Sequence, residues 1–475
     1  MAKKQDFKKI SKELLHEKKT CWEVWDGQTQ KDAFAFAEDY KVFLNRAKTE
    51  RETVDYGVKK ARRKGFKNIE ELKEIKAGDK VYFVQKDKGL ILARIGKDGL
   101  NKGFRMLMSH VDTPHLDLKI SPLYEDENLA FFKTHYYGGI KKYQWPTIAL
   151  ALHGVVCLAD GRKIDIKIGE DEKDPVFMIT DILPHLSRVG GPGSAQVNRE
   201  VQGEDLNLLI SSMPLGDKDV KEKVKLAVLK YLFDKYGIRE EDFASAEIQA
   251  VPSEKARDLG FDRSLISAYG QDDRICSFAG MEALFSSRNS KQTQICAWVD
   301  REEIGSDGST GAKSFFFENF VSRLLKLLGR EASIAGVYEA CSKSQAISAD
   351  VTAAVDPDYK DVHDLRNAHR IGFGIAMERY TGSGGKYSTS EARAEYIQEI
   401  RKILHKNKNI TYQLGGGLGK IDQGGGGTIA KYMANRDIDI VDMGVALFNM
   451  HAPLEIASKG DLYSAYLFYK EFFSN

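Results

Sequence analysis

The sequence predicts an α/β protein in which a mostly parallel sheet is sandwiched by helices and a β-rich segment is inserted. Apolar strands alternate with amphipathic helices in the second half of the chain, a pattern typical of parallel sheets covered on both faces. Between residues 118 and 252 the pattern changes to short strands and turns. Because 475 residues exceed one ordinary core, we expect two domains: 1–117 with 253–475, and the inserted 118–252.

The first part of the chain is expected to begin with helices, most clearly from Asp32 to Lys64, and to continue into a β region near Lys80–Ile95. The run GFRMLMSHVDTP then predicts a buried strand, Phe104–Ser109, that ends in a polar loop. Polar residues just beyond an apolar strand are where α/β enzymes place their sites.

The inserted segment has its own signals. LHGVVCLADGRKIDIKIG predicts a hairpin that turns at Asp160-Gly161, and a helix is expected from about Val220 to Tyr236. The strand SAEIQAV closes the segment.

The alternating pattern then returns. The predicted strands are TQICAWVD, AISADV, GFGIAMERY and DIDIVDMG, and the predicted helices are SFFFENFVSRLLKLL and TSEARAEYIQEIRKILHKN.

Composition excludes several classes of function. The 71 basic residues nearly cancel the 69 acidic ones, so a general nucleic-acid partner is not expected. The longest apolar run is too short for a membrane span, and no apolar stretch follows the lysine-rich start as a secretory signal requires. Five scattered cysteines without CxxC spacing predict reduced thiols and a cytoplasmic location.

Five positions place an acid or a histidine where an apolar strand ends or a helix begins. Each has an ordinary structural interpretation, such as a turn, a helix cap or a solvated pair. Together they form an ordered set that offers only nitrogen and oxygen ligands, which favours a site for two divalent metal ions, zinc first and cobalt or manganese as alternatives. The positions are His110-Val111-Asp112, Gln271-Asp272-Asp273-Arg274, Asp300-Arg301-Glu302-Glu303, Asp350 and His451.

Several motifs spread over most of the chain match one known family. They are SHVDTPHLDLK, YGGIKKYQW, GQDDR, DREEIGS, ISADV and VDMGVALFNMHAPLE. In order and spacing the sequence resembles the aspartyl aminopeptidases, dinuclear zinc aminopeptidases that form large oligomers. The resemblance implies a zinc-peptidase-like catalytic domain with an inserted dimerisation domain, peptide substrates, and a homo-oligomer built from dimers, with a dodecamer suggested.

The resemblance also implies residue roles. His110 and Asp350 would hold one metal, Glu303 and His451 the other, and Asp272 would bridge both. Asp112 would orient His110, and Glu302 would be the general acid/base that activates a metal-bridging water. We expect Glu302 and Glu303 to lie in an extended segment, so that their side chains point in different directions. We also expect the Asp272-Asp273 peptide bond to be cis.

Two further residues match family positions near the substrate. His185, in the HLSR motif, would lie near a neighbouring subunit's site, and Lys386, in GSGGKYS, would lie beside the substrate. The chain departs from the family after Asp350, where Ala353, Asp356 and Asp358 replace histidines and an HPN run. The family's preference for N-terminal Asp or Glu is therefore left open.

Alternative functions for the same metal-binding core are a deacylase or carboxypeptidase that uses two metals, and a non-catalytic assembly subunit that keeps the fold. Adjacent glutamates at 302 and 303 favour the enzyme, since a scaffold has no need of both.

Overall fold

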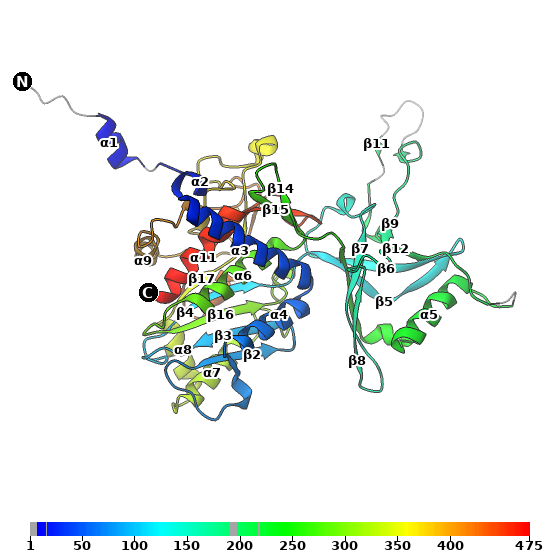
Figure 1. Cartoon of the computed structure of the whole chain (residues 1–475), viewed down its shortest axis with the longest axis horizontal. Helices are drawn as coiled ribbons and strands as arrows, with labels where there is room; N and C mark the ends of the chain where they lie inside the picture. The colour runs from blue at the N-terminus through cyan, green and yellow to red at the C-terminus, as the bar shows by residue number, and fades with distance from the viewer. Residues whose placement is uncertain (1–6, 16, 190–196, 199, 217–218) are drawn as a thin grey trace, which may run out of the picture.

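The chain folds around two sheets that lie side by side (Figure 1). The computed structural model describes residues 7–15, 17–189, 197–198, 200–216 and 219–475. None of the helices in these ranges is long and apolar enough to cross a membrane.

Nine strands form the larger sheet, in the order β1-β2-β3-β16-β4-β17-β23-β19-β21. Their bounds are β1 (Lys67–Asn68), β2 (Lys80–Gln85), β3 (Gly89–Arg94), β4 (Phe104–His110), β16 (Thr293–Val299), β17 (Gln345–Ser348), β19 (Ile375–Glu378), β21 (Tyr412–Gly415) and β23 (Asp439–Gly444). Five of the eight neighbouring pairs are parallel, which agrees with the expected mostly parallel sheet.

Helices cover both faces of this sheet because its strands are apolar on both sides. In β4, Leu107 packs into the core on one face, whereas Met106 and Met108 pack into the core on the other. The first core includes side chains of α3 (Gly27–Arg46), α4 (Glu50–Arg63), α6 (Gln271–Ser286), α9 (Ala394–Leu404) and α11 (Lys459–Ser474). The second includes side chains of α7 (Phe316–Leu327), α8 (Ile334–Ser342) and α10 (Ala430–Ala434). Two short helices, α1 (Phe7–Leu14) and α2 (Cys21–Val24), precede α3.

The expected helical run from Asp32 to Lys64 is wrong in one respect, since the chain breaks between α3 and α4. Thr49 has extended backbone angles and its side chain accepts a hydrogen bond from the Glu52 amide, which starts a new helix. The later helix predicted from Thr389 begins only at Ala394.

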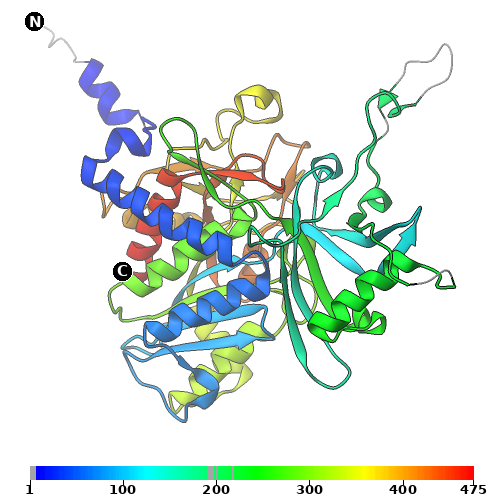
Figure 2. The same cartoon turned by 45° about the vertical axis from the view of Figure 1, so that its right-hand side comes forward.

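Seven antiparallel strands form the smaller sheet, in the order β8-β7-β13-β5-β6-β12-β9. They are β5 (His115–Asp126), β6 (Leu129–Tyr137), β7 (Leu150–Cys157), β8 (Lys163–Ile168), β9 (Met178–Ile179), β12 (Leu208–Ser211) and β13 (Ala246–Pro252). The predicted hairpin at Asp160-Gly161 joins β7 to β8, and α5 (Lys223–Tyr236) packs on the sheet (Figure 2). The division into domains at residues 117/118 and 252/253 stays a prediction.

A short strand pair, β10 (Arg188–Val189) and β11 (Val197–Asn198), lies on an arm that projects from the smaller sheet (Figures 1 and 2). A separate three-stranded sheet, β14 (Arg257–Leu259), β15 (Leu265–Ala268) and β25 (Glu455–Ser458), brings the end of the chain beside the start of α6.

A buried group of charges joins the smaller sheet to the start of α4, a helix that covers the larger sheet. His153 on β7 is fully buried, with Nδ1 2.9 Å from Glu52 of α4 and Nε2 3.1 Å from Glu170, which follows β8. Lys48 lies 2.6 Å from the same Glu170 carboxylate. Both ring nitrogens of His153 therefore face carboxylates, an arrangement that favours the charged imidazolium.

Replacing His153 with glutamine is expected to destabilise the protein more at pH 6 than at pH 9. Burial opposes the charged ring, but Glu170 and Glu52 outweigh it and raise the pKa of His153 above its ordinary value. A histidine whose pKa is raised by folding stabilises the protein fully at pH values below its pKa in the unfolded chain, about 6.5. That stabilisation is lost as the pH rises through its pKa in the folded protein. A tenfold gain in the proton affinity of the ring corresponds to about 1.4 kcal/mol of stability.

Urea unfolding of wild type and His153→Gln across this pH range measures the effect. His135→Gln, in an exposed position of the same sheet, is the control. A free-energy difference that stays constant or grows as pH rises would contradict the prediction.

Candidate metal centre

The predicted ligands gather at one edge of the larger sheet. His110 ends β4, Asp350 follows β17, and Glu303 lies in the turn after β16. These three strands are adjacent and parallel, so their carboxyl ends meet at the same edge. Asp272 begins α6, and His451 lies between β24 (Ala446–Leu447) and β25.

Asp272 lies between the two histidines. Its Oδ1 is 3.2 Å from His110 Nε2, and its Oδ2 is 3.3 Å from His451 Nε2. Asp350 Oδ1 is 3.7 Å from His110 Nε2, and Glu303 Oε2 is 3.3 Å from His451 Nε2. Asp272 thus links the two histidines, and Glu303 also lies close enough to His110 and Asp272 to share an ion with them.

These separations fit ligands of a common ion better than they fit hydrogen bonds. Two ligand atoms about 2.1 Å from one tetrahedral zinc ion lie about 3.4 Å apart. Asp272 Oδ1 and Glu303 Oε1 are buried and accept no hydrogen bond from any described residue. Buried carboxylate oxygens without a donor are costly unless a cation compensates them, so the residues present fit a divalent metal.

Each histidine is held with Nε2 facing the other ligands. His110 Nδ1 donates to the backbone carbonyl of Asp112 at 2.9 Å, and His451 Nδ1 donates to the carbonyl of Gly139 at 2.8 Å. A donating Nδ1 leaves the Nε2 lone pair free for a metal. The Asp112 carboxylate, predicted to orient His110, is farther from the ring, at 3.4 Å.

The Asp112 carboxylate instead holds the turn that carries the two glutamates. The amide of Glu302 donates to Asp112 Oδ1 and the amide of Glu303 donates to Oδ2, both at 3.1 Å. The expected extended segment at Glu302–Glu303 is wrong, since these residues begin the 3-10 turn η5 (Glu302–Ile304). The turn forms because Arg301 and Gly305 on either side adopt left-handed backbone angles.

The concentration of carboxylates alters their pKa values. Burial, aided by the negative charge of Asp350, raises the pKa of Glu302 to about 8. Burial also opposes ionisation of Asp272, but the rings of His110 and His451 outweigh it and hold the pKa of Asp272 well below its ordinary value. The site therefore favours added positive charge.

Residues that were not predicted also contribute. Glu455 accepts hydrogen bonds from the amides of Asp272 and His451, at 3.0 and 2.8 Å, and so ties two ligand segments together. Asp273 is fully buried, and its carboxylate lies close enough to His110 and Asp350 to share an ion with them. Glu455 is the last residue of the MHAPLE motif and Asp273 belongs to the GQDDR motif, but the sequence pattern assigned neither residue a role. The Asp272-Asp273 peptide bond is cis, as expected.

Comparison with known proteins identifies the family. The sequence model described as "Aminopeptidase I zinc metalloprotease (M18)" matches residues 43–473. The chain belongs to the M18 aminopeptidase family. It is thus a metal-dependent aminopeptidase of a zinc metalloprotease family, and the predicted resemblance is confirmed.

Relatives of the M18 chain match over nearly its whole length. "Probable M18 family aminopeptidase 1" of Clostridium acetobutylicum is 47% identical over 98% of this chain and 99% of its own. The crystal structure of an M18 aminopeptidase from Thermotoga maritima is 44% identical, with a TM-score of 0.92 over 97% of this chain and 100% of that one. The mApe1 dodecamer of S. cerevisiae shares the fold at 19% identity, with a TM-score of 0.73 over 92% and 96% of the two chains.

Two predicted residues of this M18 chain lie outside the cluster. His185 is exposed on the segment between β9 and the projecting β10–β11 arm, and no contact joins it to the described ligands. Lys386 Nζ pairs with Glu391 at 2.9 Å and lies 4.0 Å from the centre of the Tyr380 ring. Its charge is thus already partnered within the chain.

Proposed function

We propose that this M18 protein hydrolyses the first peptide bond of peptides by using two divalent metal ions, with zinc first among the candidates. His110 and Asp350 would hold one ion, Glu303 and His451 the other, and Asp272 would bridge them. The observation that carries the proposal is that the two oxygens of Asp272 face different histidines, each with a second carboxylate. When bound, the ions would supply positive charge that lowers the pKa of a bound water molecule to near neutral and polarises the carbonyl of the peptide bond to be cleaved.

In this proposal Glu302 moves the proton. It takes a proton from the attacking water and gives that proton to the leaving amine, so the carboxylate is regenerated at the end of each turnover. Asp112 supports this role because it fixes the backbone of Glu302 and Glu303, which keeps the base beside the ligands.

A panel of substrates separates aminopeptidase action from its alternatives. We expect hydrolysis of aminoacyl p-nitroanilides with a free α-amine, and at least about 10²-fold weaker hydrolysis of the N-acetylated forms. Metal content is measured on the same samples. Preferred cleavage of N-acylated amino acids would favour a deacylase, preferred release of C-terminal residues would favour a carboxypeptidase, and metal binding without hydrolysis would favour an assembly subunit.

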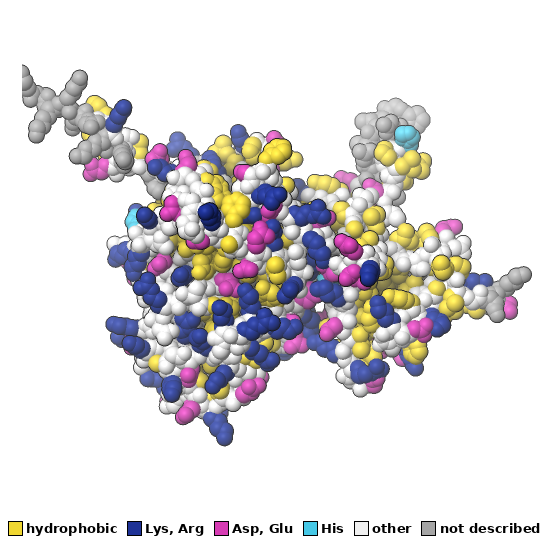
Figure 3. Space-filling view, in the orientation of Figure 1, with side chains coloured by type: hydrophobic (Ala, Val, Ile, Leu, Met, Phe, Trp, Pro, Cys, Tyr) yellow, Lys and Arg dark blue, Asp and Glu magenta, His cyan; other side chains and the backbone are white. Residues whose placement is uncertain are grey.

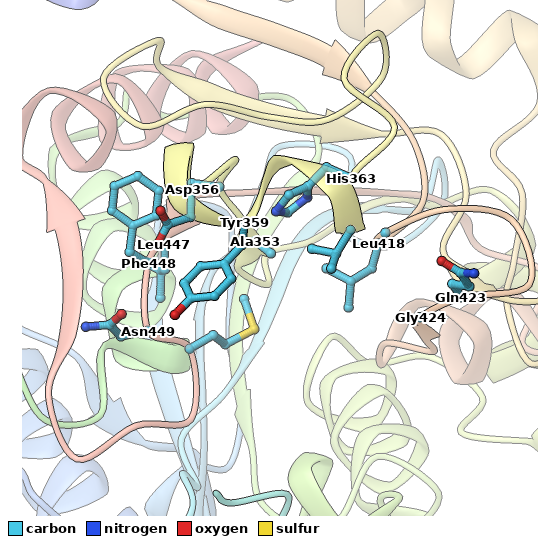
Figure 4. A pocket seen from close by; sticks show the side chains of 14 residues that line it. Ala353, Asp356, Tyr359, His363, Leu418, Gln423, Gly424, Leu447, Phe448 and Asn449 are labelled. Carbon is cyan, nitrogen blue, oxygen red and sulfur yellow. The ribbon is translucent and has the colours of Figure 1, made fainter. Parts of the chain in front are cut away.

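The preference for acidic N-terminal residues stays a prediction, and the site offers it little support. A cavity of about 450 Å³ lies between the segments that follow Asp350 and precede His451 (Figure 4). Its lining is mostly apolar, with Asp356 and His363 among its polar side chains. We propose that this cavity takes a neutral apolar first side chain, because Asp356 would repel an acidic one and Lys386 is already paired.

Leucyl and aspartyl p-nitroanilides, assayed side by side, test this preference. We expect a higher kcat/KM for the leucyl substrate, and for Asp356→Asn a larger relative gain on the aspartyl substrate. A higher kcat/KM for the aspartyl substrate in the wild type would restore the preference implied by the resemblance.

We further propose that the chain works as a homo-oligomer in the cytoplasm. Large apolar side chains are exposed on the inserted segment, and Figure 3 shows several gathered over that part of the molecule. The exposed apolar side chains of this segment include Met178, Leu183, Leu186, Met213, Leu226, Tyr231 and Phe233. In such an assembly His185 would lie near a neighbouring subunit's site, as the resemblance implies.

A further inference from the structure

The YGG motif lies against the candidate metal centre, and the function proposed so far gives its tyrosine, Tyr137, no role. Tyr137 ends β6 of the smaller sheet, and Gly138 and Gly139 follow it. The Tyr137 hydroxyl donates to Asp112 Oδ2 at 2.8 Å, and the Gly139 carbonyl accepts from His451 Nδ1. One short segment of the smaller sheet thus touches residues on both sides of the ligand cluster.

Gly138 shows how closely this segment approaches the site. Its φ is +73°, and a Cβ placed there would lie 3.1 Å from Pro114 Cγ and 3.5 Å from Glu303 Cβ. A larger residue would therefore be strained in its backbone and crowded by Pro114, with its Cβ in van der Waals contact with Glu303.

A histidine holds the Tyr137 ring in place. His115 is the cross-strand partner of Tyr137, and the two rings stack with centroids 4.5 Å apart and planes 15° apart. His115 Nδ1 faces the Thr113 carbonyl at 2.7 Å and Nε2 faces Asp117 at 2.9 Å, so both nitrogens have acceptors and the ring is suited to carry a proton. A cationic ring against the face of Tyr137 adds attraction to the packing.

The Tyr137 hydroxyl is suited to donate to Asp112 at all working pH values. Burial raises the pKa of Tyr137 far above its ordinary range, and the Asp112 carboxylate raises it further. The same Asp112 oxygen accepts from the Glu303 amide, and the other oxygen accepts from the Glu302 amide. The hydroxyl thus fixes the carboxylate that in turn fixes the glutamate turn.

We propose that Tyr137 is a positioning residue for the aminopeptidase reaction, through which the inserted segment holds Asp112 and the Glu302–Glu303 turn in the geometry for proton transfer. The inference rests on the roles proposed above for Glu302 and Glu303. It assigns the smaller sheet a direct part in completing the metal centre of its own chain.

Tyr137→Phe tests the inference, because it removes one hydroxyl and keeps the stacked ring. The loss of a hydrogen bond to a charged carboxylate is expected to lower kcat about 10-fold or more, with KM within about twofold of wild type. Bound metal per chain is expected to stay unchanged, and the urea midpoint to fall modestly because a buried hydrogen bond is lost. The matched control is Tyr136→Phe, the neighbouring residue on the opposite face of the strand, which is half exposed and should match wild type.

Each other outcome overturns the inference. A kcat of Tyr137→Phe within about twofold of wild type would show that the hydroxyl has no positioning role. A loss of kcat explained by lost metal, or by unfolded protein under the assay conditions, would show a merely structural one. Glu302→Gln is assayed in parallel: if it too keeps full activity, the proposed base has failed, whereas an inactive Glu302→Gln beside an active Tyr137→Phe overturns only the present inference.

Discussion

Glu302→Gln is expected to lower kcat by about 10²–10⁴-fold, the range attributed to general acid/base catalysis, and to leave the bound metal unchanged. Glutamine keeps the size and the backbone contacts of Glu302, including the amide bond to Asp112 Oδ1, but it cannot accept a proton. Glu302 is not among the carboxylates that pair with the two histidines, so its replacement should leave the predicted ligands in place. Glu302 directly precedes the predicted ligand Glu303, and Asp112 accepts from both backbone amides, which keeps the Glu302 carboxyl near the ligand cluster.

Steady-state kinetics and metal analysis on the same preparations measure the two halves of this prediction. Glu70→Gln is the control, because Glu70 is an exposed glutamate that pairs with Arg323 of α7 on the protein surface. Near-normal kcat in Glu302→Gln would show that another group moves the proton. Lost metal in that variant would instead place Glu302 among the ligands.

The positions of the central strands could be predicted because their residues are apolar on both faces. TQICAWV and RMLM are buried along their whole length or nearly so, and each is followed at once by polar residues of the site. The break between α3 and α4 was missed because apolar periodicity continues through it. Thr49 and Glu52 have the Thr-x-x-Glu spacing that marks a helix start, so a signal for the break was present in the sequence.

The ligand set could be predicted in type and order because each member stands next to a strand or a helix start. The contacts that hold the ligand segments in place could not be predicted, since they depend on how the two sheets meet in space. Tyr137 reaches Asp112 across 25 residues of sequence, and no local spacing predicts that bond. The shape of the Glu302–Glu303 turn was missed for a related reason, because Arg301 must adopt a left-handed conformation that its residue type does not favour.

Asp272→Ala is expected to remove most of the bound metal, whereas Asp350→Ala should remove about one ion of two. Asp272 Oδ1 lies 3.2 Å from His110 Nε2 and Oδ2 lies 3.3 Å from His451 Nε2, so the loss of Asp272 would take a ligand from each proposed ion. Of these two histidines, Asp350 faces His110 alone. The number of metal ions bound per chain in the two variants therefore tests whether Asp272 is shared by both ions. It is measured by metal analysis after dialysis against a defined zinc concentration.

The response to a chelator gives a second measurement that does not depend on activity. A ligand that binds only the folded state raises stability in proportion to the logarithm of its concentration over its Kd, so wild type should lose stability when the metal is removed. Asp272→Ala should unfold at the same urea concentration with or without chelator, since it has little metal to lose. Circular dichroism checks that the variant is folded, because Asp272→Ala also removes the carboxylate that faces His110 and His451. Full metal content in Asp272→Ala, or equal losses in both variants, would rule out a shared carboxylate and with it the proposed pair of ions.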